Sequence, residues 1–170
     1  MAINNDPHIH EQVVCANVFI RKDGKYLVLR RSTLKRYAPG YVHPIGGKAD
    51  KDENPYVAAL REVREEAGIA VKNVRLEAVL LEIRPEKNEP YNWFIFHFSA
   101  DYESGEVKQT EEGELVLLTD EELRKENLFP SVRPIIHHIL DREQGTIFAT
   151  VEYEGDHKVL QYSTAFCMIR

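Results

Sequence analysis

The chain has few cysteines and no long hydrophobic run, and both absences narrow the class of protein. Its cysteines, Cys15 and Cys167, stand in separate apolar segments without the CxxC spacing of a zinc or redox site. Buried free thiols are therefore favoured over a disulfide or a metal site. No apolar stretch approaches the roughly 20 residues of a membrane-spanning helix, so no membrane partner is expected. The polar first residues lack the apolar core of a secretory signal, which predicts a cytoplasmic protein.

An excess of positive charge is also absent. The net charge is −6, and no Lys/Arg-rich tract stands out. A general nucleic-acid-binding surface is therefore not expected, although a local basic pocket is compatible with this composition. Without repeats, low-complexity tracts or linkers, the sequence predicts a polar tail at 1–11 and a single domain at 12–170. Whether the chain forms a homodimer is left open.

Residue patterns predict strands separated by two or three helices. The turn at 22–25 contains Gly24, and Thr119 to Glu122 form a capping box that opens a short helix. Because most strands follow one another in hairpin order, the pattern predicts an α+β fold, an αβα sandwich with a mixed β-sheet. The expected strands are 13–20, 25–31, 41–47, 74–83, 91–101 and 114–119, with a C-terminal hairpin at 145–166. The expected longer helices are 54–67 and 131–143.

The helix expected at 54–67 has an unusual acidic side. Pro55 fits its first turn and Gly68 its end. At 100° per residue, three glutamates fall opposite an apolar stripe that should face the core. A solvated acidic face is one interpretation, but like charges three and four residues apart destabilise a helix, and clustered carboxylates suit hard cations. The stripe contains Val57, Leu60, Val63 and Ala67, and the acidic side contains Glu62, Glu65 and Glu66.

The turn before this helix extends the cluster. Gly46 and Gly47 allow a close approach of backbone or ligand. Glu53 precedes the helix and could join the carboxylates. Arg61 could hold one or two of the glutamates in a fixed orientation.

The spacing of these residues resembles the signature of a known family, the Nudix box. Gly47 is followed after five residues by Glu53, and after seven more by the run Arg61 to Ile69, which reads REVREEAGI. Every fixed position of the 23-residue signature is filled over residues 47–69. The strand order around it is similar to the Nudix fold over about 13–142, whereas the hairpin at 145–166 lies outside the family core.

The resemblance implies a Mg2+-dependent hydrolase, with Mn2+ as an alternative ion, that cleaves a pyrophosphate bond in a nucleoside diphosphate linked to another moiety. By this resemblance Glu62, Glu65 and Glu66 are metal ligands, and Glu65 is also catalytic. Glu53 supports the metal site, and Arg61 orients the glutamates. The divalent ion would also relieve the repulsion among the carboxylates.

Family members often use a further acidic residue on a loop as a ligand or general base. The segment 108–118 resembles that loop, with Glu112 as the first candidate and Glu111 and Glu114 after it; a solvated acidic turn is the alternative. Basic residues near the glycine turn are candidates for binding phosphate. The candidate substrate-binding residues are Arg31, Lys35, Arg36, Gly46 and Gly47, with Arg30 as a further basic neighbour.

The side chains that would select the substrate are harder to assign. Trp93 belongs to an aromatic strand for which core packing is favoured over stacking on a base. His97, His137 and His138 are interpreted as packing or surface residues, and the role of His43 is open.

Four functions remain in competition. A nucleoside triphosphate, including an oxidised one, is the first choice of substrate, because 110–123 resembles the final segment of small Nudix proteins with that activity. ADP-ribose or a nucleotide sugar is the second, because Pro85 stands sixteen positions after Ile69. A non-catalytic nucleotide-binding module is disfavoured because all box glutamates are present. An isopentenyl-diphosphate isomerase is disfavoured because HPIGG stands where its catalytic cysteine would be.

Overall fold

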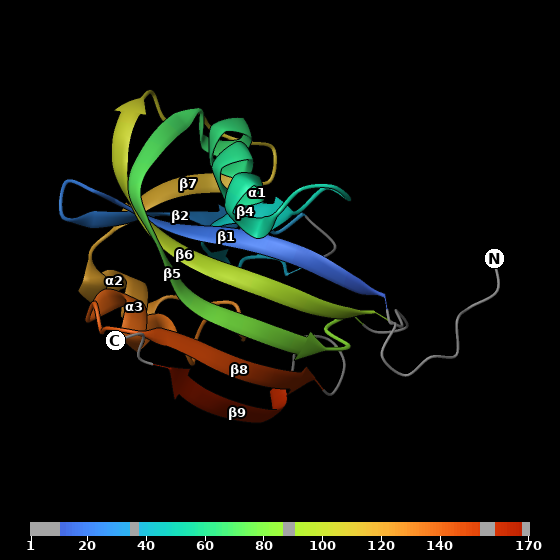
Figure 1. Ribbon diagram of the computed structural model, residues 1–170. Coiled ribbons are helices and arrows are strands. Elements are labelled where there is room, and N and C mark those ends of the chain that lie inside the picture. Colours follow the sequence, from blue (N-terminus) through green and yellow to red (C-terminus); the bar gives the residue numbers. More distant parts are fainter. Residues whose placement is uncertain (1–10, 35–37, 87–90, 154–158, 168–170) are drawn as a thin grey trace.

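One mixed β-sheet forms the frame of the molecule (Figure 1). The computed structural model describes residues 11–34, 38–86, 91–153 and 159–167. Within these ranges no helix has the length and apolar content to cross a membrane. The strands of the described part are β1 (Gln12–Lys22), β2 (Lys25–Arg31), β3 (Val42–His43), β4 (Ile45–Lys48), β5 (Ile69–Ile83), β6 (Asn92–Gly105), β7 (Gly113–Leu118), β8 (Thr146–Tyr153) and β9 (Val159–Cys167).

The strands are ordered β3-β2-β1-β6-β5-β8-β9, with β4 paired to β1 and β7 paired to β2. The β1–β6 and β5–β8 pairs are parallel and the others are antiparallel, so the predicted mixed sheet is confirmed. The β8–β9 hairpin adds two strands beside β5. Residues 154–158 of the expected hairpin and the expected tail at 1–11, apart from Glu11, lie outside the described residues.

Helical segments cover both faces of the sheet, as the αβα prediction requires (Figure 1). Strand residues alternate between two cores. Ala16, Val18 and Ile20 of β1 pack with α1, whereas Cys15 and Phe19 pack in the core that contains α2 and α3. Cys15 is a buried free thiol, as predicted. The helical segments are α1 (Pro55–Glu62), a π-helical turn (Val63–Ala67), α2 (Asp120–Lys125) and α3 (Ile136–Leu140).

The buried face of α1 differs from the predicted stripe. Val57 is 48% exposed, whereas the small Ala58 and Ala59 are fully buried and let the helix approach the sheet closely. Val63 and Ala67 are buried as expected, and Leu60 is half-buried. The prediction for Val57 was wrong because it assigned the larger apolar residues of an ideal helical wheel to the core. In the structure, the helix packs against the sheet through its smallest side chains, those of Ala58 and Ala59.

Local chemistry explains where the helices begin and end. Asn54 caps α1 by accepting from the amides of Tyr56 and Val57, and Gly68 ends the π-turn with φ of 72°. The capping box of Thr119 and Glu122 is present at α2. The helix expected at 131–143 is confined to Ile136–Leu140, because Pro134 disfavours helical backbone in the residue before it.

Candidate active site

Two glycines of β4 bring the sheet into contact with the glutamates. The Gly46 amide donates to Glu66 Oε2 at 3.2 Å. A side chain on Gly46 would place its Cβ 2.1 Å from the Ala16 carbonyl, and Gly46 has φ of +151°. A Cβ on Gly47 would lie 2.7 Å from Glu62 Oε1. Gly46 therefore requires glycine for the backbone pairing with β1, whereas a side chain on Gly47 would displace the Glu62 carboxylate.

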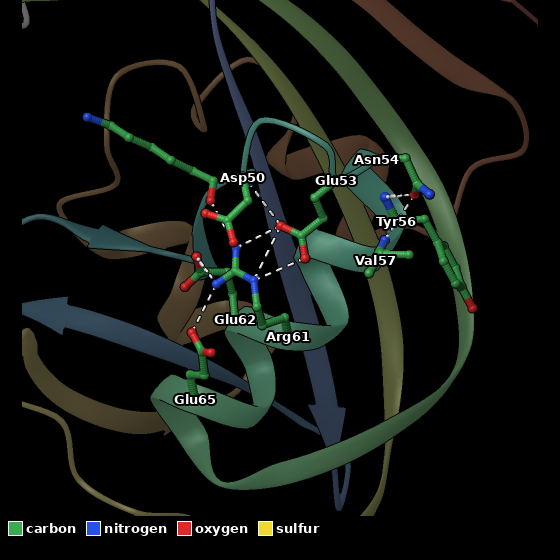
Figure 2. Close-up of polar contacts among 9 residues, drawn as sticks. Asp50, Glu53, Asn54, Tyr56, Val57, Arg61, Glu62 and Glu65 are labelled. Atoms are coloured by element: carbon green, nitrogen blue, oxygen red, sulfur yellow. Dashed lines mark hydrogen bonds and ion pairs between the residues drawn. The ribbon is translucent and has the colours of Figure 1, made fainter.

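Arg61 holds three carboxylates with one guanidinium (Figure 2). Its Nε and Nη2 donate to Glu53 at 3.0 and 2.9 Å, and its Nη1 donates to Glu62 and Glu65, each at 2.9 Å. Nη2 also donates to the Lys48 carbonyl at 3.0 Å. We expected Arg61 to orient one or two glutamates, and in the structure it contacts three, Glu53, Glu62 and Glu65.

The glutamates do not share one exposed face. The Glu65 side chain is 60% exposed, the Glu62 side chain is only 14% exposed, and Glu66 is half-buried. The expectation that all three lie opposite the core is therefore wrong for Glu62 and Glu66. The π-turn after Glu62 and the contact with the β4 glycines place these two carboxylates against the sheet.

Burial and mutual repulsion raise the proton affinity of the inner carboxylates. Burial raises the pKa of Glu66 to about 7, and the charges of Glu62 and Glu112 act in the same direction. Burial also raises the pKa of Glu62, against its bond to Arg61. The bond to Arg61 instead lowers the pKa of Glu53. The inner pair, Glu62 and Glu66, is therefore where added positive charge would be most favourable.

The pairing of β2 with β7 brings Glu112, the first candidate for the acidic loop residue, close to the cluster that contains Glu66. The Glu112 carboxylate lies 3.3 Å from Arg31 Nη2, and the Glu112 carbonyl accepts from the Ser32 amide at 3.1 Å. Glu114 pairs instead with Arg30 at 3.7 Å, and Glu111 is exposed. Of the three acidic candidates, Glu112 is the one that contributes to the field at Glu66.

Other predicted site residues are not gathered in this way. Lys35 and Arg36 lie outside the described residues, whereas Arg31 pairs with Glu112 and its neighbour Arg30 pairs with Glu114 and Glu126. Over the described ranges, no three acidic, histidine or cysteine side chains stand where they could jointly hold a metal ion as they are. The bonds of Glu62 and Glu65 to Arg61 account for this, because they direct both carboxylates toward the guanidinium.

A cavity of about 300 Å³ adjoins the cluster, and sequence reasoning did not find it. Gly46 and Gly47 line it, as do Arg31 and Trp93. His97, interpreted from the sequence as packing or surface, also lines it and is 1% exposed. The alternation of residues in 91–101 was a usable signal, because it places Trp93, Ile95 and His97 on one face of β6.

Comparisons with known proteins agree with this arrangement. The model of the NUDIX domain matches residues 10–139. An uncharacterized Nudix hydrolase of Bacillus subtilis, YvcI, is 28% identical over 148 residues, which are 86% of this chain and 90% of that protein. The chain therefore belongs to the NUDIX family. It is a Nudix hydrolase, an enzyme that acts on phosphorus-containing anhydrides.

Solved structures show the same fold. A mutator MutT protein from Bacillus halodurans superposes with a TM-score of 0.77 at 25% identity, over 89% of this chain and 97% of that one. An ADP-ribose pyrophosphatase from Streptococcus suis superposes with a TM-score of 0.62 at 20% identity, over 81% of this chain and 99% of that one.

Proposed function

We propose that this Nudix hydrolase is a nucleoside triphosphate pyrophosphohydrolase, with an oxidised base as one form of its substrate. The observation that carries the proposal is that the cavity and the acidic cluster lie on either side of the same two glycines. Gly46 and Gly47 line the cavity and also touch the carboxylates of Glu66 and Glu62. A nucleoside in the cavity would therefore extend its phosphates toward the acidic cluster.

The carboxylates fit a divalent cation in their chemistry. The NUDIX family generally uses divalent metal ions such as Mg2+. Glu62, Glu65 and Glu66 offer only oxygen donors, which Mg2+ and Mn2+ prefer. Burial raises the pKa of Glu62 and of Glu66, which means that their ionised forms are destabilised and would gain from a nearby cation. In the proposal, Glu62 or Glu65 turns away from Arg61 to complete the ligand set. When bound, such an ion would supply positive charge to the diphosphate oxygens and lower the pKa of a water molecule.

The chain's own residues position the reactants. Arg61 remains bonded to Glu53 by three hydrogen bonds when its other partners turn, so Glu53 keeps Arg61 and the helix start in place. Glu65, the most exposed of these acids, is proposed to act in catalysis with the ion. Arg31 lines the cavity and would bind a phosphate. Glu112, held by Arg31, is proposed as the general base, because it lies at the edge of the same cluster.

A second substrate class has some support. The superposed ADP-ribose pyrophosphatase from Streptococcus suis shares the fold, and Pro85 is compatible with that class. ADP-ribose carries a second ribose beyond its diphosphate. The cavity volume of about 300 Å³ is at the lower end of ligand pockets, about 300–1,000 Å³, which favours a single nucleoside.

The test is hydrolysis by the purified protein with MgCl2, measured on nucleoside triphosphates, ADP-ribose and nucleotide sugars. We expect the highest kcat/KM on one or more nucleoside triphosphates. Glu66→Gln and Glu65→Gln should each lower kcat by about 100-fold or more, because a lost charged ligand costs several kcal/mol of barrier.

The matched control is Glu103→Gln, which removes an exposed carboxylate far along β6 and should leave kcat unchanged. Activity of Glu66→Gln within about threefold of wild type would reject the proposed role of the cluster. If ADP-ribose or a nucleotide sugar is the best substrate, the protein belongs instead to the second class.

A further inference from the structure

The floor of the cavity is made by two neighbouring parallel strands. In the β1–β6 pair, Cys15 lies opposite Ile95 and Asn17 lies opposite His97. Alternate residues of a strand share a face, so these four side chains and Trp93 point to the same side of the sheet. All five line the cavity. Side chains that stand 80 residues apart in the sequence thus form one surface.

His97 is an unusual residue for such a floor. It is 1% exposed, and neither of its ring nitrogens has a hydrogen-bond partner among the described residues. A buried polar group without a hydrogen-bond partner destabilises the folded chain. Burial lowers the pKa of His97 to about 3, and the neighbouring His43 acts in the same direction. The ring is therefore neutral near pH 7 and offers one donor and one acceptor.

The rest of the lining indicates the kind of group that would contact His97. Apolar side chains of β6 and of the segment before α3 dominate the walls, among them Ile95, Phe129 and Val132. Trp93 presents a large flat ring. Of the two cationic side chains of the lining, Arg31 is paired with Glu112, and Lys48 lies over the Trp93 ring, 5.2 Å from its centroid. The inner cavity therefore suits an uncharged, flat, mostly apolar group with a polar edge.

We propose that the cavity binds a nucleobase and that His97 is a specificity-determining residue that hydrogen-bonds the polar edge of the base. A sugar fits less well, because hydroxyl groups on every side of its ring would meet apolar walls. The inference rests on the proposed function for the position of the phosphates. It goes further by identifying the nucleobase as the part of the substrate that the protein recognises and His97 as the residue that contacts it.

Trp93 makes the test direct, because it is the only tryptophan of the chain. Its fluorescence reports binding in EDTA, where hydrolysis does not occur. The ligands are the four common nucleoside 5′-monophosphates and ribose 5-phosphate, which lacks only the base. We expect the preferred monophosphate to bind at least about tenfold tighter than ribose 5-phosphate, about 1.4 kcal/mol. Equal affinities would overturn the proposal.

Two substitutions isolate the histidine. His97→Phe removes both ring nitrogens, and His97→Gln keeps a donor and an acceptor. His97→Phe should weaken binding of the preferred monophosphate about tenfold and leave ribose 5-phosphate unchanged, while His97→Gln should retain more affinity. The control is His138→Phe, which removes a buried histidine bonded to Glu143 and Gly145 outside the cavity. Equal losses in His97→Phe and His97→Gln, with both folded by thermal melting, would contradict the hydrogen-bonding role.

The same preparations separate this inference from the proposed function. Glu103→Gln should bind the monophosphate in EDTA as wild type does, because it removes an exposed carboxylate of β6 that does not line the cavity. If wild type hydrolyses nucleoside triphosphates but binds no base preferentially, the inference alone fails. If bases bind through His97 but no nucleotide is hydrolysed with MgCl2, the proposed function alone fails.

Discussion

Arg61 is the residue that makes a dense acidic cluster tolerable in the free protein. It bonds Glu53, Glu62 and Glu65 at once, so these carboxylates share one positive charge. These bonds raise the pKa of Arg61 above its ordinary value. Repulsion remains between Glu62 and Glu66, because Glu66 bonds only the Gly46 amide among the contacts described above. Cation binding must therefore compete with Arg61 for Glu62 and Glu65.

Glu82 is a buried acid on the same face of the sheet as the cavity floor. It is fully buried in β5, opposite Trp93 in the β5–β6 pair. Burial raises its pKa from 4.5 to about 7, and Ser131 and Tyr153 oppose this only in part. The negative form of Glu82 would also raise the pKa of the Cys15 thiol. The carboxyl is therefore destabilising wherever it is ionised.

We predict that Glu82→Gln removes a pH dependence of stability. Between about pH 4.5 and 7 the unfolded chain releases a proton that the folded chain keeps, so the free energy of unfolding falls as pH rises. The loss should reach about 3 kcal/mol at about 1.4 kcal/mol per pH unit, and then stay constant above about pH 7.

The measurement is urea unfolding of wild type and Glu82→Gln at several pH values between about pH 5 and pH 8. The stability of the variant relative to wild type should increase across this range and level off. Glu103→Gln, at an exposed position, should show no such trend. A constant difference between Glu82→Gln and wild type would contradict the raised pKa.

At the scale of the element, α1 and the π-helical turn that follows it provide a matched pair of valines, Val57 and Val63. Val63 is 1% exposed and Val57 is 48% exposed. We predict that Val63→Ala lowers the free energy of unfolding by about 2 kcal/mol, through lost burial and a small cavity. Val57→Ala should change it by less than about 0.5 kcal/mol, because the site is on the surface. Urea unfolding measures both changes. Equal losses of unfolding free energy would mean that Val57 is buried, as the helical wheel predicted.

The strand β4 provides a second matched pair. Gly46→Ala would force a Cβ against the Ala16 carbonyl, which is backbone and cannot move aside. We predict a loss of stability of about 2 kcal/mol or more. Gly47→Ala would meet only the end of the Glu62 side chain, which can turn away.

Gly47→Ala should therefore stay folded, with a change in stability below about 1 kcal/mol, while kcat falls at least about tenfold because Glu62 is displaced. Thermal melting and the hydrolysis assay separate the two outcomes. Full activity of Gly47→Ala would show that the position of Glu62 against β4 is unimportant for the reaction.

At the scale of the whole molecule, a bound cation should stabilise the fold. An ion that binds only the folded chain adds about 1.4 kcal/mol at tenfold its Kd, which raises Tm by about 3–6 °C. We predict this shift for wild type with MgCl2 relative to EDTA. Sodium chloride at matched ionic strength should not reproduce it, because screening acts on all charges alike.

The triple variant of Glu62, Glu65 and Glu66 to Gln should lose the Mg2+-specific shift. In EDTA we expect no gain in its stability, because Arg61 loses two partners while the repulsion is relieved. Scanning calorimetry on both proteins measures these values. A wild-type shift no larger than that in sodium chloride would contradict metal binding to the free protein.

Local sequence determined much of this protein. The spacing from Gly47 to Ile69 predicted the family and the acidic cluster, and Pro55, Gly68 and the Thr119 capping box marked helix ends that the structure confirms. These predictions succeeded because each depends on residues within a few turns of one another. Propensity, capping and the i+3 and i+4 geometry of a helix act over that distance.

Tertiary structure decided the rest. The sequence could not show that β1 lies parallel to β6, so it left His97 among the packing residues although it faces Asn17 across that pair. It also could not show that β4 would cover Glu62 and Glu66, or that small alanines would give α1 its buried face. The physical reason is that strand pairing and close packing join residues far apart in the chain, and burial then sets both exposure and pKa.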